Sequence, residues 1–360
     1  MSANGAKMRN GAVNMELSER KKKLLAAIVE RYIATGEPVG SKALAALPDL
    51  AVSSATIRNE MAELVSMGLL EQPHTSAGRI PSSAGYRYYV DNLMGRYELS
   101  PNEKRLIDMK LQTASGDAQK VLESAGNILA EMTRCAAVST TPADEAAVVR
   151  RVELVPIGTR TAMIVMLTSS GILKSRVCKT TSEITVDMAE SFYNIVNANF
   201  IGKPAAAMHI AKIQTLAVSL GEKSLEMTPL LVALADVAAM TERTELLLEG
   251  QSNLLGYKEY AQNAYELIEF LRRAEPLGQI FSHQQKSGEK GGLQVLIGDE
   301  NRFRELQNSS MIFGNYEIAG HQSGTLGLIG PTRIDYARLI PSLQYLTQIV
   351  GKILSDNVEE

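Results

Sequence analysis

Cysteine, histidine and tryptophan are scarce in this 360-residue chain, which has two cysteines, four histidines and no tryptophan. The two cysteines, Cys135 and Cys178, lack the Cys-x-x-Cys spacing of zinc and redox sites and are too few for a framework of disulfides. The histidines are scattered, with no His-x-x-x-His pair, so neither a metal site nor a nucleophile-and-base pair has a visible framework. We therefore expect no enzyme, no metal and no cofactor, and a reducing cytoplasm fits the cysteine usage.

Long apolar runs are also lacking. No run approaches the roughly 18 residues that a membrane-spanning helix needs, and residues 1–16 are small and polar, without the apolar segment of a signal peptide. Apolar residues still make up 45% of the chain and charged residues 21%, which is typical of a soluble globular protein. We expect a cytoplasmic protein of two or three domains with no membrane partner.

Charge is unevenly distributed along the chain. Residues 1–96 hold 12 lysines and arginines against 9 acidic residues, a net charge of +3, and the remainder carries −6 because the whole chain has −3. Neutralising phosphates requires positive charge at the binding surface rather than over the whole protein. The bias therefore indicates a polyanion partner at the N-terminal end alone.

Three helices and a hairpin are predicted in the first hundred residues. Apolar residues recur at helical spacing over 17–35, 41–47 and 54–67, with serines placed to cap the helices and glycine or proline placed to end them. Two short strands follow at 69–71 and 80–81, joined by a polar loop. This order of elements is typical of a winged helix-turn-helix, whose second helix of the pair enters the major groove of DNA.

The third helix has the side chains that this role requires. With Ile57 and Met61 facing inward, a step of 100° per residue turns Arg58 and Asn59 outward. Arginine pairs with guanine and asparagine with adenine, so we expect these two residues to read bases. Hydroxyls and free N–H groups at the start of a helix hold phosphates, and the residues expected to do so here are Ser53, Ser54 and Thr56.

The loop between the two strands and the second helix supply further expected contacts. Arg79, preceded by Thr75 and Ser76, lies where a wing touches the DNA backbone or the adjacent minor groove, and Lys42 is placed to anchor the second helix on a phosphate. The alternative is that the outward residues of the third helix are ordinary solvated positions of a structural module. The pattern alone leaves both interpretations open.

Tyr86-Arg87-Tyr88-Tyr89 has the composition of a stacking box for nucleic acid bases. Tyrosines at helical spacing more commonly pack in a core, so we expect these to lie between the first domain and the next. A linker is predicted near residues 95–101.

The remaining residues alternate between strand and helix patterns. Alternating apolar residues over 148–157, 161–167 and 172–178 predict an antiparallel meander. Residues 184–273 are mostly helical in pattern, including one long amphipathic stretch over 227–248.

A second set of strands follows at 293–297, 310–313, 316–319 and 325–329, before a final helix that contains Pro341. Strands on both sides of a helical block indicate one α+β domain whose sheet is interrupted by an inserted, mostly helical subdomain.

Several motifs resemble those of the HrcA family of heat-inducible transcription repressors. In the first hundred residues they are Glu-Pro-Val-Gly-Ser-Lys at 37–42, Ser-Ala-Thr-Ile-Arg-Asn-Glu-Met at 54–61 and His-Thr-Ser-Ala-Gly-Arg-Ile-Pro at 74–81. Further along the chain they are Gly-Gln-Ser-Asn-Leu-Leu at 250–255, Ile-Gly-Asp-Glu-Asn at 297–301 and Gly-Leu-Ile-Gly-Pro-Thr-Arg-Ile-Asp-Tyr at 327–336. The resemblance covers roughly residues 17–355.

The resemblance implies an α+β protein with a winged helix-turn-helix, a GAF-like domain and an inserted dimerisation domain. It further implies repression of heat-shock chaperone operons through an inverted-repeat operator in double-stranded DNA, bound by a homodimer, and modulation by the GroEL-type chaperonin. The expected division of the chain is a flexible tail at 1–16, the DNA-binding domain at 17–97, the first part of the GAF-like domain at 101–182, the inserted domain at 183–276 and the second part of the GAF-like domain at 277–360.

Two rival functions are kept beside this interpretation. The first is a metabolite-sensing regulator with a small ligand in the GAF-like domain, and the second is a scaffold protein. Gly320, Gly324, Gly327 and Gly330 match neither G-x-G-x-x-G nor a P-loop. Thr332 and Arg333, next to a helix start, have the chemistry to hold an anion, but we expect a structural cap or a salt bridge to the rest of the domain.

Overall fold

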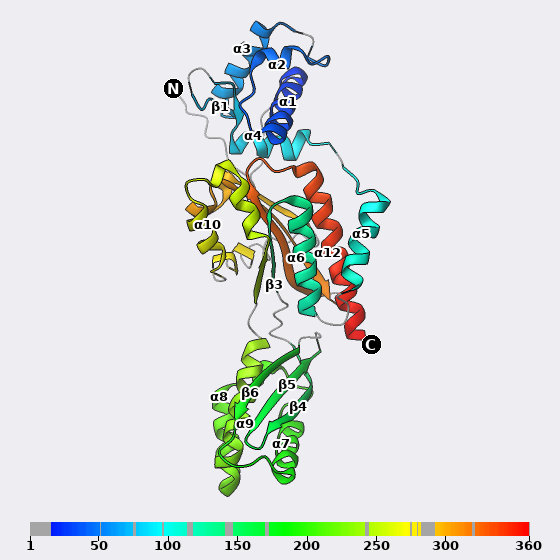
Figure 1. Cartoon of the computed structure of the whole chain (residues 1–360), viewed down its shortest axis with the longest axis vertical. Coiled ribbons are helices and arrows are strands. Elements are labelled where there is room, and N and C mark those ends of the chain that lie inside the picture. The colour runs from blue at the N-terminus through cyan, green and yellow to red at the C-terminus, as the bar shows by residue number, and fades with distance from the viewer. Residues whose placement is uncertain are drawn as a thin grey trace.

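The chain folds into three units that follow one another along a long axis (Figure 1). An N-terminal unit lies at one end, a central unit in the middle, and a third unit, inserted into the central one, at the other end. The computed structural model describes residues 16–50, 52–74, 77–95, 97–113, 118–140, 147–169, 173–241, 245–273, 276–278, 280–281, 292–318 and 321–359.

The N-terminal unit is the predicted bundle of three helices with a hairpin, followed by a short fourth helix. Its elements are α1 (Glu19–Thr35), α2 (Ser41–Ala45), α3 (Ser54–Ser66), β1 (Leu70–Glu71), β2 (Ile80–Pro81), α4 (Ser83–Tyr88) and the π-helical turn η1 (Tyr89–Leu93). The predicted ends of α1 are confirmed, because Ser18 caps its first turn and Gly36 ends it in the left-handed conformation at φ 67°. Leu24, Ile28 and Ile57 are fully buried in the core of this unit.

The hairpin is widened by the segment before α2. Val39 and Arg79 exchange two backbone hydrogen bonds of 2.9 Å, which adds an isolated bridge beside the β1–β2 pair. Gly78 permits this approach, since a Cβ on it would lie 2.4 Å from the carbonyl oxygen of Val39. The wing is therefore joined to the turn between α1 and α2.

The central unit is built on a five-stranded antiparallel sheet. Its strand order is β7 (Leu246–Glu249), β3 (Ala136–Thr140), β10 (His321–Pro331), β9 (Ser309–Ile318) and β8 (Gln294–Ile297). The helices around it are α5 (Pro101–Gln112), α6 (Ala118–Thr133), α10 (Ala264–Leu271) and α12 (Tyr336–Glu359), with short 3₁₀ turns η4 (Gln251–Gly256), η5 (Lys258–Tyr260), η6 (Gly298–Glu300) and η7 (Arg304–Leu306).

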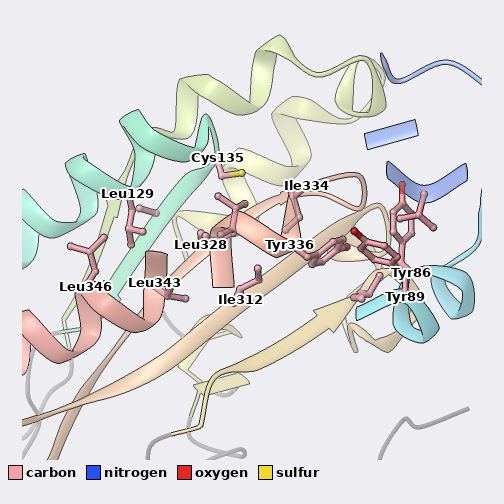
Figure 2. Close-up of a cluster of buried hydrophobic side chains, with 14 of the residues drawn as sticks. Tyr86, Tyr89, Leu129, Cys135, Ile312, Leu328, Ile334, Tyr336, Leu343 and Leu346 are labelled. Carbon is pink, nitrogen blue, oxygen red and sulfur yellow. The ribbon is translucent and has the colours of Figure 1, made fainter. Parts of the chain in front are cut away.

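Both faces of this sheet are buried. Ala137 faces the core beneath α6 and α12, whereas Ala136 and Val138 face the core that includes residues of α10. Figure 2 shows the first of these cores, where side chains of α6, α12 and the sheet meet; those labelled there include Leu129, Ile312, Leu328, Leu343 and Leu346. The same core continues into the N-terminal unit through Tyr86 and Tyr89. The first two units therefore share one apolar cluster.

The inserted unit has a sheet of its own. The antiparallel strands β4 (Val149–Gly158), β5 (Thr161–Thr168) and β6 (Leu173–Lys179) pack with α7 (Val186–Asn199), η2 (Ala205–Met208), α8 (Ile210–Ser219), η3 (Gly221–Lys223) and α9 (Ser224–Thr241). Alternate residues of β5 are buried against these helices, namely Ala162, Ile164, Met166 and Thr168. The meander expected from the sequence is thus present, but it packs on α7–α9 and belongs to no strand pair of the central sheet.

Two details of the predicted elements are wrong, and one strand was missed. The stretch over 227–248 is not one helix, because α9 ends at Thr241 and the chain re-enters the central sheet as β7. The strand β3, which the sequence pattern did not predict, lies in the middle of that sheet. The strands expected at 310–313 and 316–319 are parts of the single strand β9.

One helix among the described residues is long and apolar enough to cross a membrane by length and composition. This helix is α9, and half of that stretch is buried inside the protein. Its buried residues, among them Leu230, Leu234 and Val237, belong to the core under β4–β6. This burial is typical of a helix in the core of a folded domain.

Candidate nucleic-acid interface

The start of α3 is organised by serine and threonine hydroxyls. Ser53 is the N-cap: its Oγ accepts from the backbone N–H of Thr56 at 3.2 Å and lies 3.0 Å from the Thr56 hydroxyl. The Ser54 hydroxyl lies 3.1 Å from that of Ser41 and so ties the start of α3 to the start of α2. Ser53 is exposed and Ser54 and Thr56 are half-buried. The hydroxyls thus fix the angle between the two helices and leave the mouth of α3 accessible.

The predicted orientation of α3 is what the structure shows. Ile57, Met61 and Leu64 are buried, while Arg58 and Asn59 are exposed. Within the part of the chain that the structure describes, the side chains of Arg58 and Asn59 form no hydrogen bond or ion pair with another residue. Their donors are therefore available to an external partner.

The acidic residues of α3 are paired with basic residues of α1, a feature the sequence analysis missed. Arg20 donates its Nε to Oε1 of Glu60 at 2.5 Å, and Lys21 lies 2.6 Å from Oε2 of Glu63. The Glu60 side chain is only 7% exposed. A glutamate within the inward stripe of α3, three residues after Ile57, is the signal that predicts such a basic partner, because a buried carboxylate requires one. The pairs offset two negative charges on the helix that carries Arg58.

The wing residues have a different environment. The backbone of Arg79 is held by Val39, and its half-buried side chain donates from Nη1 to the carbonyls of Ala77 and Gly78 at 3.3 and 3.4 Å. Its Nε is buried and has no hydrogen-bond partner among the described residues. Thr75 and Ser76 lie outside the described residues.

The residues of α2 and α3 expected at DNA share one end of the molecule. Lys42 is exposed on α2, which the serine pair joins to α3. Figure 1 shows α2 and α3 at the outer end of the N-terminal unit, with α4 between them and the central unit. The described parts of the chain contain no group of three or more histidine, cysteine or acidic side chains placed to hold a metal ion.

Comparisons with known families agree with this geometry. The model of the winged helix-turn-helix transcription repressor, HrcA DNA-binding family matches residues 16–92, and the model of the HrcA protein C-terminal domain matches residues 119–340. The chain belongs to the HrcA family. The predicted family and the winged helix-turn-helix with an α+β remainder are thereby confirmed. The N-terminal unit is a DNA-binding domain, and the protein is a transcription repressor and not an enzyme.

Individual relatives match over nearly their whole length. The heat-inducible transcription repressor HrcA of Acetivibrio thermocellus is 32% identical over 95% of this chain and 99% of its own, and that of Desulforudis audaxviator is 35% identical over 94% and 98%. A crystal structure titled as that of a hypothetical protein is 25% identical, with a TM-score of 0.66, over 95% of this chain and 100% of the other. The fold therefore has a solved counterpart along almost the entire chain.

Proposed function

We propose that this repressor binds, as a homodimer, an inverted-repeat operator in the promoters of heat-shock chaperone operons, and that the GroEL-type chaperonin modulates its activity. The observation that carries the proposal is the outward face of α3, where Arg58 and Asn59 are exposed and unpaired among the described residues. A cytoplasmic location follows from this role, because the operator lies on the bacterial chromosome.

The proposed contacts with DNA are of two kinds, contacts to base edges and contacts to phosphates. Arg58 and Asn59 read base edges, since their donors and acceptors match guanine and adenine in the major groove. The residues that hold phosphates are Lys42, Ser53, Ser54, Thr56, Thr75, Ser76 and Arg79. At the start of α3, Ser53 is exposed, whereas Ser54 and Thr56 are half-buried, and in the wing Arg79 donates to its own loop.

An inverted repeat requires two recognition helices related by a two-fold axis, and hence a dimer. The inserted unit offers the surface for it. Leu173 and Val177 of β6 are 62% and 56% exposed on the face of the sheet opposite α7–α9. Val155 of β4 and Met163 of β5 are in register with Val177, which makes an apolar row across all three strands.

A self-complementary sheet face of this kind buries its apolar row against the same row of a second copy. The dimerisation unit that we propose therefore starts at about residue 147, before β4, and ends with α9 at Thr241. This replaces the expected range 183–276, which would divide the meander from its helices and include β7 of the central sheet.

Gel-shift titration on the promoter of the organism's own chaperonin operon tests the proposal. The protein should shift the inverted repeat at lower concentration than a scrambled sequence of equal length, and added chaperonin should change the fraction bound. Equal affinity for both sequences would show that the chain does not read an operator, and an unchanged fraction would remove the chaperonin from the proposal.

The alternative of a metabolite-sensing regulator has one structural feature to examine. A cavity of about 500 Å³ lies at the surface between the linker after η1 and α12, lined in part by Tyr97, Leu99, Lys104 and Tyr345. Its lining residues come from the linker and from α5 and α12 of the central unit. A ligand-induced rise in melting temperature would support this alternative.

A further inference from the structure

The N-terminal unit is fixed to the central unit on the side that faces away from α3. In Figure 1 α4 lies at the boundary between the two units, whereas α2 and α3 lie at the far end. The boundary contacts are made by α4 and by the C-terminal end of α1, with η6, η5 and the β10–α12 connection opposite them. The surface that binds DNA is therefore left open by these contacts.

The first boundary contact is a two-pronged ion pair. Arg87 of α4 donates from Nε to Oε1 of Glu300 at 2.8 Å and from Nη2 to Oε2 at 2.5 Å. Nη2 also donates to the carbonyl of Val295 in β8 at 2.5 Å. The Arg87 side chain is 13% exposed and that of Glu300 is 28% exposed. A planar guanidinium with two parallel bonds to a carboxylate fixes orientation as well as distance.

The second boundary contact places a cation of the central unit at the end of α1. Arg333 is paired through Nε with Glu259 of η5 and lies over the ring of Tyr257, 5.4 Å from its centroid. A Cβ on Gly36 would lie 3.2 Å from the Arg333 guanidinium carbon, so this side chain touches the C-cap of α1. The last turn of α1 has no basic residue of its own. Arg333 therefore supplies the positive charge that a helix C-terminus favours.

Tight packing between the two ion pairs limits rotation of one unit on the other. The rings of Tyr86 and Tyr336 lie 5.9 Å apart across the boundary, and both residues are buried. A Cβ on Gly298 would lie 2.1 Å from Oγ of Ser83, so η6 and α4 are in close contact. The expectation that the tyrosines of α4 pack between two domains agrees with this arrangement, as does the expected structural ion pair of Arg333.

We propose that Arg87 and Arg333 are positioning residues that set the half-site spacing which the dimer accepts. The proposal rests on the function proposed above. Two recognition helices bind together only if they stand about one helical turn of DNA apart, roughly 34 Å, or a multiple of that distance. The two arginines hold each DNA-binding unit at one angle on the body of the dimer. Without them each unit would turn on the linker after η1 and reach half-sites at several spacings.

A residue that positions the DNA-binding unit and a residue that contacts DNA should affect binding in different ways. Neither arginine lies on the outward face of α3, so the affinity for a single half-site should be unaffected by their loss. The dimer binds a pair of half-sites more tightly than a single half-site, because binding of one unit raises the effective concentration of the second unit at its own half-site. At the matched spacing this gain in affinity is about 100-fold. That gain depends on the angle of the units and should become smaller and less dependent on spacing when the ion pairs are removed.

The dependence of affinity on spacing can be measured with a series of operators that differ only in the distance between half-sites. We expect the wild-type dimer to lose about 100-fold in affinity when the spacing is changed by half a helical turn. The variants Glu300→Gln and Arg333→Ala should lose only about tenfold or less over the same series. Glu300→Gln keeps the shape of the side chain and an acceptor for the N–H of Ile297, so it serves if Arg333→Ala fails to fold.

Arg272→Ala is the matched control, because this exposed arginine at the C-cap of α10 pairs with Glu269 of that helix and lies outside the boundary contacts. It should retain the wild-type profile. The exchanged pair Arg87→Glu with Glu300→Arg should restore part of the spacing dependence that each single change removes.

Two failures are distinguishable. If the wild-type dimer binds an inverted repeat at one spacing and both variants keep that profile, the positioning role is wrong and the proposed function stands. If the wild-type protein binds no inverted repeat at any spacing, the proposed function is wrong and the positioning role falls with it.

Discussion

Replacing Arg58 by alanine removes a guanidinium that no other described residue holds. The side chain is exposed on α3 and its neighbour Ile57 carries the packing of that turn. Alanine is at least as good a helix former as arginine, so α3 should keep its structure. We expect the free energy of unfolding to change by less than about 0.5 kcal/mol.

The effect on DNA binding should be much larger. A two-pronged contact between arginine and guanine contributes about 1–3 kcal/mol of discrimination. At about 1.4 kcal/mol per factor of ten, operator affinity should fall by about 5- to 150-fold. Lys42→Ala, which removes an expected phosphate contact, should instead weaken binding to all sequences alike and reduce the slope of log affinity against log salt by about 1.

Fluorescence anisotropy with operator and scrambled duplexes, at two or more salt concentrations, separates these outcomes. Arg58→Ala should reduce the ratio of the two affinities, whereas Lys42→Ala should leave that ratio unchanged. Equal losses on operator and scrambled DNA for Arg58→Ala would refute its assignment as a base-reading residue.

Three further changes test other parts of the structure. Arg20→Ala leaves the buried carboxylate of Glu60 unpaired, so the melting temperature should fall in calorimetry, and Arg20→Lys should restore part of the loss; an unchanged melting temperature would contradict the pairing. Val177→Glu places a charge in the apolar row of β6 and should yield monomers in sedimentation velocity, whereas an intact dimer would move the interface elsewhere. Burial raises the pKa of the Cys135 thiol to about 12, so a thiol reagent at pH 8 should modify the half-buried Cys178 first and reach Cys135 only on unfolding. Equal rates for the two cysteines would show that Cys135 is accessible.

The N-terminal unit was predictable because its signals are local. The serine before α3, the glycine after α1 and the apolar spacing of α3 lie within one or two helical turns of the elements they define. Caps and amphipathic spacing act through neighbours three or four residues apart, so the sequence itself displays them. The outward position of Arg58 follows from the same spacing.

The central sheet was harder to predict because its strands are buried on both faces. Residues 136–140 read Ala-Ala-Val-Ser-Thr and are all buried, so β3 lacks the alternation of a half-exposed strand. Residues 246–249 read Leu-Leu-Leu-Glu and continue the apolar spacing of α9, although they pair with β3. Short apolar runs of this kind are compatible with either helix or strand, and tertiary pairing decides between them.

Ion pairs between distant elements could not be predicted from the sequence. Arg87 and Glu300 are 213 positions apart, and only the approach of α4 to η6 brings them together. The Arg20–Glu60 pair is nearer in sequence, at 40 positions, and a buried glutamate on α3 was its only signal. Such pairs depend on how whole elements dock, which composition and periodicity do not specify.

Two copies of α3, delivered by one dimer, should read an inverted repeat. Hydroxyl-radical footprinting on the promoter of the organism's own chaperonin operon tests it most directly. We expect two protected segments, related by a dyad, with their centres about 10 base pairs apart or a multiple of that distance. No protection at low salt, or one protected segment without a symmetric partner, would contradict it.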